Sequence, residues 1–251
     1  MIHDLFFSIC DYLNFKEIVQ YELISKHHLK MIRQHVWYHP LKINRIDQWY
    51  YPLKIKTKNL LLILIDRYQL RNLNLSYSDV TDEIIKLLNC HTLNLAGTNV
   101  TDESVKLLKC HCLDLSNTKV TDESVKLLKC HTLNLSHTSV TDESVKYLKC
   151  HTLYLKNTKV TDESVKHLQC HTLDISFTNV TDESVKNLKC HTLNLSLTEV
   201  TDESIKLLKC HNLDLSFTNI TDEGVKHLNN SHTIILFKTK TSEEMRQKLK
   251  Y

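Results

Sequence analysis

Glycine and proline are nearly absent from this sequence. Among its 251 residues there are two glycines, Gly97 and Gly224, and two prolines, Pro40 and Pro52. Because tight two-residue hairpins depend on glycine or asparagine at positive φ, this scarcity argues against a fold built on such hairpins. It also excludes glycine-rich phosphate-binding loops of the G-x-G-x-x-G and P-loop types. The strand connections must therefore use other residues.

A strong charge excess and long apolar runs are also missing. Lys and Arg total 32 against 29 for Asp and Glu, a formal charge of +3. This balance gives no reason to expect nucleic acid or an anionic membrane as the main partner. No apolar run approaches the about 20 residues of a membrane span, and no basic segment precedes the first apolar residues as in a signal peptide. We therefore expect a cytoplasmic or nuclear protein whose nine cysteines are reduced.

What the sequence does have is a repeat of 20 residues, in which a Cys-His pair recurs at 90, 110, 130, 150, 170, 190 and 210. The shared pattern is C-H-T-L-x-L-S-x-T-x-V-T-D-E-S-V-K-x-L-K. Its spacing is that of a leucine-rich repeat, with cysteine in the first apolar place and threonine in the asparagine place. Units this small bury their apolar faces only by stacking, so the pattern predicts a solenoid.

Each unit is expected to contain one short strand. In the copy that starts at residue 110, Leu113 and Leu115 point to the core, and Cys112 and Asp114 point to the opposite, concave face. Strands of successive units lie parallel. The predicted fold class is therefore α/β, a solenoid with parallel strands on its concave face and short helices on its convex face.

The rest of the unit carries turn and helix signals. The hydroxyl of Thr118 is expected to bond the backbone of the turn after the strand. Thr121 is a good N-cap, and the acids after it suit the positive end of a helix. Val125 and Leu128 then face inward from a helix of about two turns. The cysteine that opens each unit is expected to pack as a small buried hydrophobe, with the following histidine exposed in a column.

The repeat defines the expected domain boundaries. Repeats of 20 residues occupy 70–229, a linker and N-terminal capping repeat occupy 39–69, and a C-terminal capping repeat occupies 230–251. The last of these is expected to hold a strand at 234–236 and a helix carrying Met245 and Leu249. Residues 1–38 do not follow the repeat, and their apolar spacing indicates helices.

Residues 1–38 resemble an F-box. Ile9, Tyr12 and Leu13 fall on its I-x-x-y-L positions, residues 24–26 (Ile-Ser-Lys) on V-s-K, and Trp37 on the closing tryptophan, although Met-Ile stands in place of the initial Leu-Pro. The repeats resemble the cysteine-containing leucine-rich repeats found mainly in F-box proteins. The combination is similar to the F-box/leucine-rich-repeat proteins of large DNA viruses.

This resemblance implies a non-enzymatic substrate receptor of an SCF-type ubiquitin ligase, in which the F-box docks on a Skp-type adaptor and the solenoid recruits a protein target. The implied adaptor-binding residues are Leu5, Ile9, Tyr12, Leu13 and Ile24. The alternative is a scaffold or host-interaction protein whose N-terminal helices only cap the solenoid, with no link to ubiquitin.

The Cys-His pairs suggest a metal or pH-sensitive protein as a third reading. Tetrahedral zinc needs four convergent ligands, whereas here the thiol points inward and the next imidazole points elsewhere. Stacked columns of Ser, His and Asp likewise make no single asymmetric catalytic site. We expect no catalytic residues, no metal and no cofactor. Charging the whole histidine column is disfavoured, so we expect mild acid to loosen the solenoid.

The positions that differ between copies are more informative, since they indicate where a partner binds. Apolar residues at exposed positions often mark interaction sites. The predicted partner-binding residues on the concave face and its rim are Tyr77, Asp114, Tyr154, Lys156, Asp174, Phe177, Leu197, Asp214 and Phe217.

Overall fold

The computed structural model describes residues 41–42, 71–228 and 233–249. The F-box-like segment, 1–38, lies outside these residues, and so do its implied adaptor-binding positions Leu5, Ile9, Tyr12, Leu13 and Ile24. The prediction for that segment therefore stays a prediction. In the described part no helix is long and apolar enough to cross a membrane.

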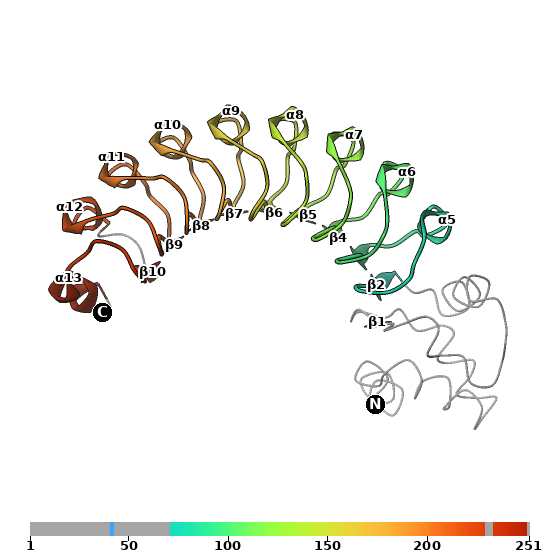
Figure 1. The fold of residues 1–251 in the computed structure, drawn as a ribbon, viewed down its shortest axis with the longest axis horizontal. Helices are drawn as coiled ribbons and strands as arrows, with labels where there is room; N and C mark the ends of the chain where they lie inside the picture. Colours follow the sequence, from blue (N-terminus) through green and yellow to red (C-terminus); the bar gives the residue numbers. More distant parts are fainter. Residues whose placement is uncertain (1–40, 43–70, 229–232, 250–251) are drawn as a thin grey trace, which may run out of the picture.

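The described chain forms an arc with one parallel sheet along its inner side (Figure 1). The sheet has ten strands in sequence order, each paired in parallel with the strand one repeat later. Registers are constant, with Leu113 beside Leu133, because every full repeat has the same length. The strands are β1 (Leu41–Lys42), β2 (Asn72–Asn74), β3 (Thr92–Asn94), β4 (Cys112–Asp114), β5 (Thr132–Asn134), β6 (Thr152–Tyr154), β7 (Thr172–Asp174), β8 (Thr192–Asn194), β9 (Asn212–Asp214) and β10 (Thr233–Ile235).

Short helices form the outer side of the arc (Figure 1). They are α5 (Asp82–Ile85), α6 (Asp102–Val105), α7 (Asp122–Val125), α8 (Asp142–Val145), α9 (Asp162–Val165), α10 (Asp182–Val185), α11 (Asp202–Ile205), α12 (Asp222–Val225) and α13 (Glu243–Lys248). The predicted length of two turns is wrong for the repeats, whose helices span four residues. After Val125 the chain continues in a tighter turn, with the N–H of Leu128 bonded to the Val125 carbonyl at 3.1 Å.

The core lies between the strands and the helices. In the repeats from β2 to α12, the inward leucines or isoleucine of the strands, the valine or isoleucine that ends each helix and the seven repeated cysteines Cys90–Cys210 are buried, as the pattern predicted. Thr121 caps α7 by accepting a hydrogen bond from the Glu123 N–H. The Thr118 hydroxyl bonds the Leu115 carbonyl at 2.6 Å, as predicted for the turn. The predicted strand at 234–236 is shifted by one residue, to Thr233–Ile235.

The first acid of each helix has a role that the helix dipole alone did not predict. The Asp142 carboxylate accepts hydrogen bonds from the backbone N–H and the hydroxyl of Thr161 and from the hydroxyl of Ser164. The same three bonds join Asp82 to the next repeat and recur up to Asp182. At the end of the series Gly224 stands in the serine place. From α6 to α12, each helix is thus capped by the aspartate of the helix before it.

Candidate functional site: the concave face and its rim

The concave face is built from the outward residues of the strands. An Asn or Asp ends most strands, and its side-chain oxygen accepts the backbone N–H of the residue two positions later at 2.9–3.1 Å. This Asx geometry starts the turn that leaves the strand. Asp114, Asp174 and Asp214, predicted as partner-binding residues, are half-buried and hold their own turns in this way.

Strand β6 interrupts this column. Tyr154 replaces the Asn or Asp, and Lys156 replaces the small residue that follows in the other full repeats. Tyr154 is half-buried and Lys156 is exposed. A shallow hollow of about 230 Å³ runs over the strands from β2 to β6, and Tyr154 and Asp114 are among its lining residues. Near the middle of the concave face, the predicted pair Tyr154 and Lys156 therefore places an aromatic and a cationic side chain where the other full repeats have Asn or Asp and a small residue.

The turn after each strand has an unusual backbone. The turn from Leu95 closes through the Thr98 N–H, which bonds the Leu95 carbonyl at 3.2 Å, and its third residue, Gly97, has φ of +65°. This is the position at which a type II turn requires glycine or asparagine. In this molecule the rim row occupies it: Tyr77, Gly97, Asn117, His137, Asn157, Phe177, Leu197, Phe217 and Lys238, all with positive φ.

Bulky residues in this row are strained. Phe177, Leu197 and Phe217 have φ of +59°, +58° and +58°. A left-handed backbone costs a residue with a Cβ about 1–2 kcal/mol, and Asn or Gly tolerate it better. Because the sequence has only two glycines, bulky residues occupy these turn positions, and the backbone along the rim is strained.

The rim row divides into three sectors. At its N-terminal end the ring of Tyr77 lies against Gly97, since a Cβ placed on Gly97 would come within 2.5 Å of it. The middle is polar, with the side chains of His137 and Asn157 bonded at 2.9 Å. From Phe177 to Phe217 the row is apolar, and Lys238 ends it. The structure therefore separates Tyr77 from the other predicted aromatic residues.

The apolar end forms one patch, which we call the apolar patch: Phe177, Leu197, Phe217, Ile235 and Phe237. Their side chains are 43–59% exposed. The rings of Phe217 and Phe237 meet edge to face at 5.3 Å. The ammonium group of Lys238 lies over both rings, 5.2 and 5.6 Å from their centroids.

Sequence reasoning missed two members of this patch. Ile235 pairs with Asp214 in the sheet, so it occupies a concave position, and Phe237 follows two residues later. The sequence feature that could have identified them is a one-residue insertion, which shifts the last strand relative to the 20-residue repeat. Once this insertion is allowed for, Ile235 falls on the position of Asp214 and Phe237 on that of Ser216 in the preceding repeat.

The cysteines and histidines do not converge. Burial raises the pKa of the Cys130 and Cys150 thiols to about 12, so they stay protonated at neutral pH. The predicted concave thiol, Cys112, is half-buried in β4. Among the described residues no three His, Cys, Asp or Glu side chains come together in a way that could hold a metal ion.

The comparisons with known proteins concern the fold. The family model for the leucine-rich repeat matches residues 211–228. The chain folds as a leucine-rich-repeat solenoid. It is similar in structure to an internalin of Listeria monocytogenes, with a TM-score of 0.52 and 19% identity over 74% of this chain and 67% of the internalin.

A second similar structure is TLR13 in its complex with ssRNA13. The TM-score is 0.55 and the identity 16%, over 89% of this chain but only 35% of the TLR13 chain. No curated protein sequence matches. Since both solved structures are less than 25% identical to this chain, they show the architecture of the leucine-rich-repeat solenoid and nothing further about its ligand.

Proposed function

We propose that this leucine-rich-repeat solenoid is a non-enzymatic scaffold that binds a protein partner through the apolar patch and the neighbouring concave face. One observation carries the proposal. Phe177, Leu197 and Phe217 hold large apolar side chains in water at positions where the backbone disfavours them. Strained backbone and exposed apolar surface together are typical of binding sites.

The remainder of the concave face supports this assignment. Aromatic residues dominate binding energy at protein interfaces, and three of the five patch residues are phenylalanine. The half-buried Asp214 pairs with Ile235 of the patch, and the half-buried Asp174 lies three residues before Phe177. The exposed Lys156 adds a cation on the preceding repeat. An apolar centre with a polar surround is the usual anatomy of a protein interface.

Photo-crosslinking tests the location. Benzoylphenylalanine replaces Phe177 or Phe217 in one set, and Leu127 or Leu207, which are exposed beyond the helix ends, in a matched set. We expect one and the same crosslinked protein from both patch positions and no such product from the two controls. The proposal is overturned if the crosslinked partner appears only at the control positions.

In its more specific form, the proposal is that the protein is an F-box/leucine-rich-repeat substrate receptor of an SCF-type ubiquitin ligase, acting in the cytoplasm or nucleus. It rests on the resemblance of residues 1–38 to an F-box and on the repeat type that follows. A pulldown with a purified Skp-type adaptor tests this. Wild type should bind, and the double variant Ile9→Asp, Leu13→Asp should not.

Failure of the wild type to bind the adaptor would leave the alternative, a scaffold or host-interaction protein whose N-terminal helices only cap the solenoid. The crosslinking and the pulldown report on different segments. Each form of the proposal can therefore fail alone.

A further inference from the structure

The edge of the solenoid at the amino ends of the strands carries a row of stacked histidines. Their ring centroids lie 4.5–4.7 Å apart from one repeat to the next. The main chain fixes this spacing, since the N–H of His131 donates to the His111 carbonyl at 2.8 Å and the bond recurs along the row. The row consists of His91, His111, His131, His151, His171, His191 and His211.

Exposed lysines stand two residues before most of these histidines: Lys109, Lys129, Lys149, Lys189 and Lys209. No carboxylate of the described residues forms an ion pair with any of these five lysines. The lysines at the helix ends differ, since Lys146 and Lys166 pair with glutamates of their own helices. We call the histidine row and these five lysines the basic edge.

A hollow of about 710 Å³ opens on the basic edge. It is lined by Lys126, Lys129 and Lys149 and by His111 and His131, with Leu127, Leu128, Cys130 and Tyr147 completing the wall. None of the described residues that line it carries a carboxylate.

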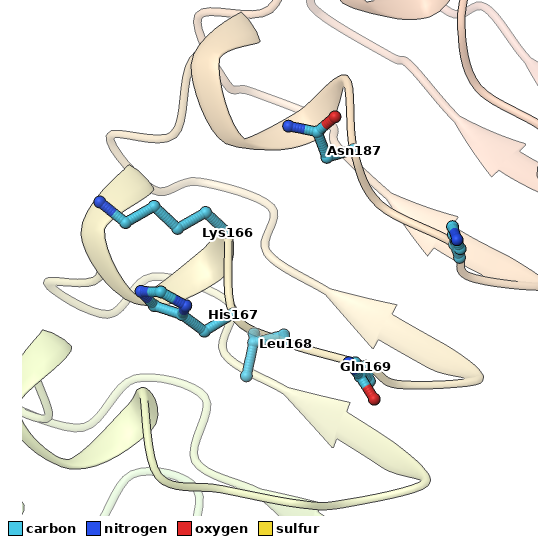
Figure 2. Close-up of a pocket in the computed structure, with 6 residues that line it drawn as sticks. Lys166, His167, Leu168, Gln169 and Asn187 are labelled. Carbon is cyan, nitrogen blue, oxygen red and sulfur yellow. The ribbon is translucent and has the colours of Figure 1, made fainter.

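A second hollow of about 570 Å³ lies further along the same edge and contains Lys166, His167, Gln169, Asn187 and Lys189. Figure 2 shows the Lys166 and His167 side chains extending from the end of α9. In the part of the chain that the structure describes, no Asp or Glu lines this hollow either.

The formal charge of the whole chain, +3, gives no indication that cationic side chains gather on one edge. The acids stand at the start of each helix, and most of the aspartates accept hydrogen bonds from the next repeat. The cations stand at the end of each helix and in the turn that follows. Near neutrality of the whole chain therefore coexists with an edge that gathers lysines and histidines.

We propose that the basic edge binds a linear chain of phosphate groups, seated first in the hollow lined by Lys126, Lys129 and Lys149. A phosphate group offers more acceptor oxygens than a carboxylate and suits several convergent N–H donors. Lysines of the basic edge recur in most turns of the solenoid, so a polymer gains more than a single anion. Inorganic polyphosphate and the backbone of a single-stranded nucleic acid share this chemistry.

This site is separate from the proposed protein-binding surface. The rim row follows the carboxyl ends of the strands, and the basic edge precedes their amino ends. Loss of either activity should leave the other intact.

The histidines make the binding depend on pH. The titratable groups that face His131 are His111 and His151 in its row, Lys129 before it, and Lys126, Lys149 and Tyr147 around the hollow. The Cys130 thiol, with its raised pKa, stays neutral. Partial burial and the neighbours His131 and His171 lower the pKa of His151. A phosphate chain favours the imidazolium form, so binding takes up protons and tightens as the pH falls.

Fluorescence anisotropy with the full chain tests the proposal, using labelled polyphosphate of about 20 units and a homothymidine oligonucleotide of similar length at about 0.1 M salt. We expect Lys129→Gln with Lys149→Gln to weaken binding about tenfold or more. The control pair, Lys119→Gln with Lys159→Gln, removes the same charge from exposed lysines near the rim and should change binding far less. Whichever polymer binds more tightly identifies the source of the phosphates.

Two further readouts separate this proposal from general charge attraction. Affinity should rise about tenfold between about pH 7.5 and 5.5, and His131→Gln with His151→Gln should remove that rise while leaving binding at the higher pH in place. Thermal melts confirm that each variant is folded. The proposal is overturned if neither phosphate polymer binds, if both lysine pairs matter equally, or if polyglutamate of equal charge binds as tightly.

Discussion

The carboxylate of Asp142 caps a helix that is not its own. It accepts the backbone N–H and the hydroxyl of Thr161 at 2.9 and 2.7 Å. The hydroxyl of Ser164 adds a third bond at 2.6 Å. Each helix of the repeats has only four residues and cannot be stable alone, so bonds of this kind between repeats hold the convex side together.

Removal of this cap should be strongly destabilising. Hydrogen bonds to charged groups contribute about 1.5–3 kcal/mol, so we expect Asp142→Ala to lower the free energy of unfolding by about 2–3 kcal/mol. The control is Glu143→Ala. Among the described residues that exposed side chain forms an ion pair only with Lys146, at 3.9 Å, and we expect a loss below about 1 kcal/mol. Urea unfolding measures both, and equal losses would contradict the capping role.

Relief of strain in the rim row should stabilise the protein. Leu197 has φ of +58°, where glycine is unstrained. We expect Leu197→Gly to raise the free energy of unfolding by about 0.5–1 kcal/mol, after allowing for the greater freedom of glycine in the unfolded chain. Leu207 is also exposed but is not among the residues with positive φ, so Leu207→Gly should lower stability by a similar amount. Shifts of the same sign would show that strain does not set stability here.

The Ser176 hydroxyl offers a second matched pair. Its oxygen is buried and has no hydrogen-bond partner among the described residues, whereas the Ser116 hydroxyl donates to Asp114 at 2.7 Å. Because an unsatisfied buried hydroxyl is unfavourable, Ser176→Ala should be neutral or stabilising by up to about 1 kcal/mol, and Ser116→Ala destabilising by about 1 kcal/mol. A clear loss in Ser176→Ala would indicate that this hydroxyl has a partner.

Mild acid should loosen the solenoid. Partial burial, then His131 and His171, hold the pKa of His151 below its ordinary value of 6.5. A histidine whose pKa is lower in the folded than in the unfolded chain stabilises the fold above its unfolded pKa, and that stabilisation is lost as the pH falls through about 6.5. The melting temperature should therefore drop between about pH 7.5 and 5.5, and drop less in His151→Gln. An identical drop in the variant would exclude His151 as the source.

The sequence predicted the strands, the core and the buried cysteines because these follow from spacing alone. Leu113 and Leu115 are two apart and had to face inward once the solenoid was inferred. Helix length was overestimated, since Leu128 reaches the core from a tight turn instead of a second helical turn. The positive φ of Phe177 was not predictable, because local preference argues against it.

Ile235 and Phe237 were not predicted as members of the patch, because the one-residue insertion before β10 shifts their positions relative to the repeat. The site was therefore predicted only in part. The predicted residues Phe177, Leu197 and Phe217 lie together, Tyr77 does not join them, and two members were found only in three dimensions.

The most direct test of the account replaces the apolar rim without disturbing the fold. Phe177→Asn, Leu197→Asn and Phe217→Asn together remove the apolar side chains and place at each positive φ a residue that tolerates it. With benzoylphenylalanine at Tyr154 as the reporter, the account predicts that this variant melts at the same or a higher temperature and loses the partner crosslink. A crosslink of undiminished yield in the folded variant would contradict it.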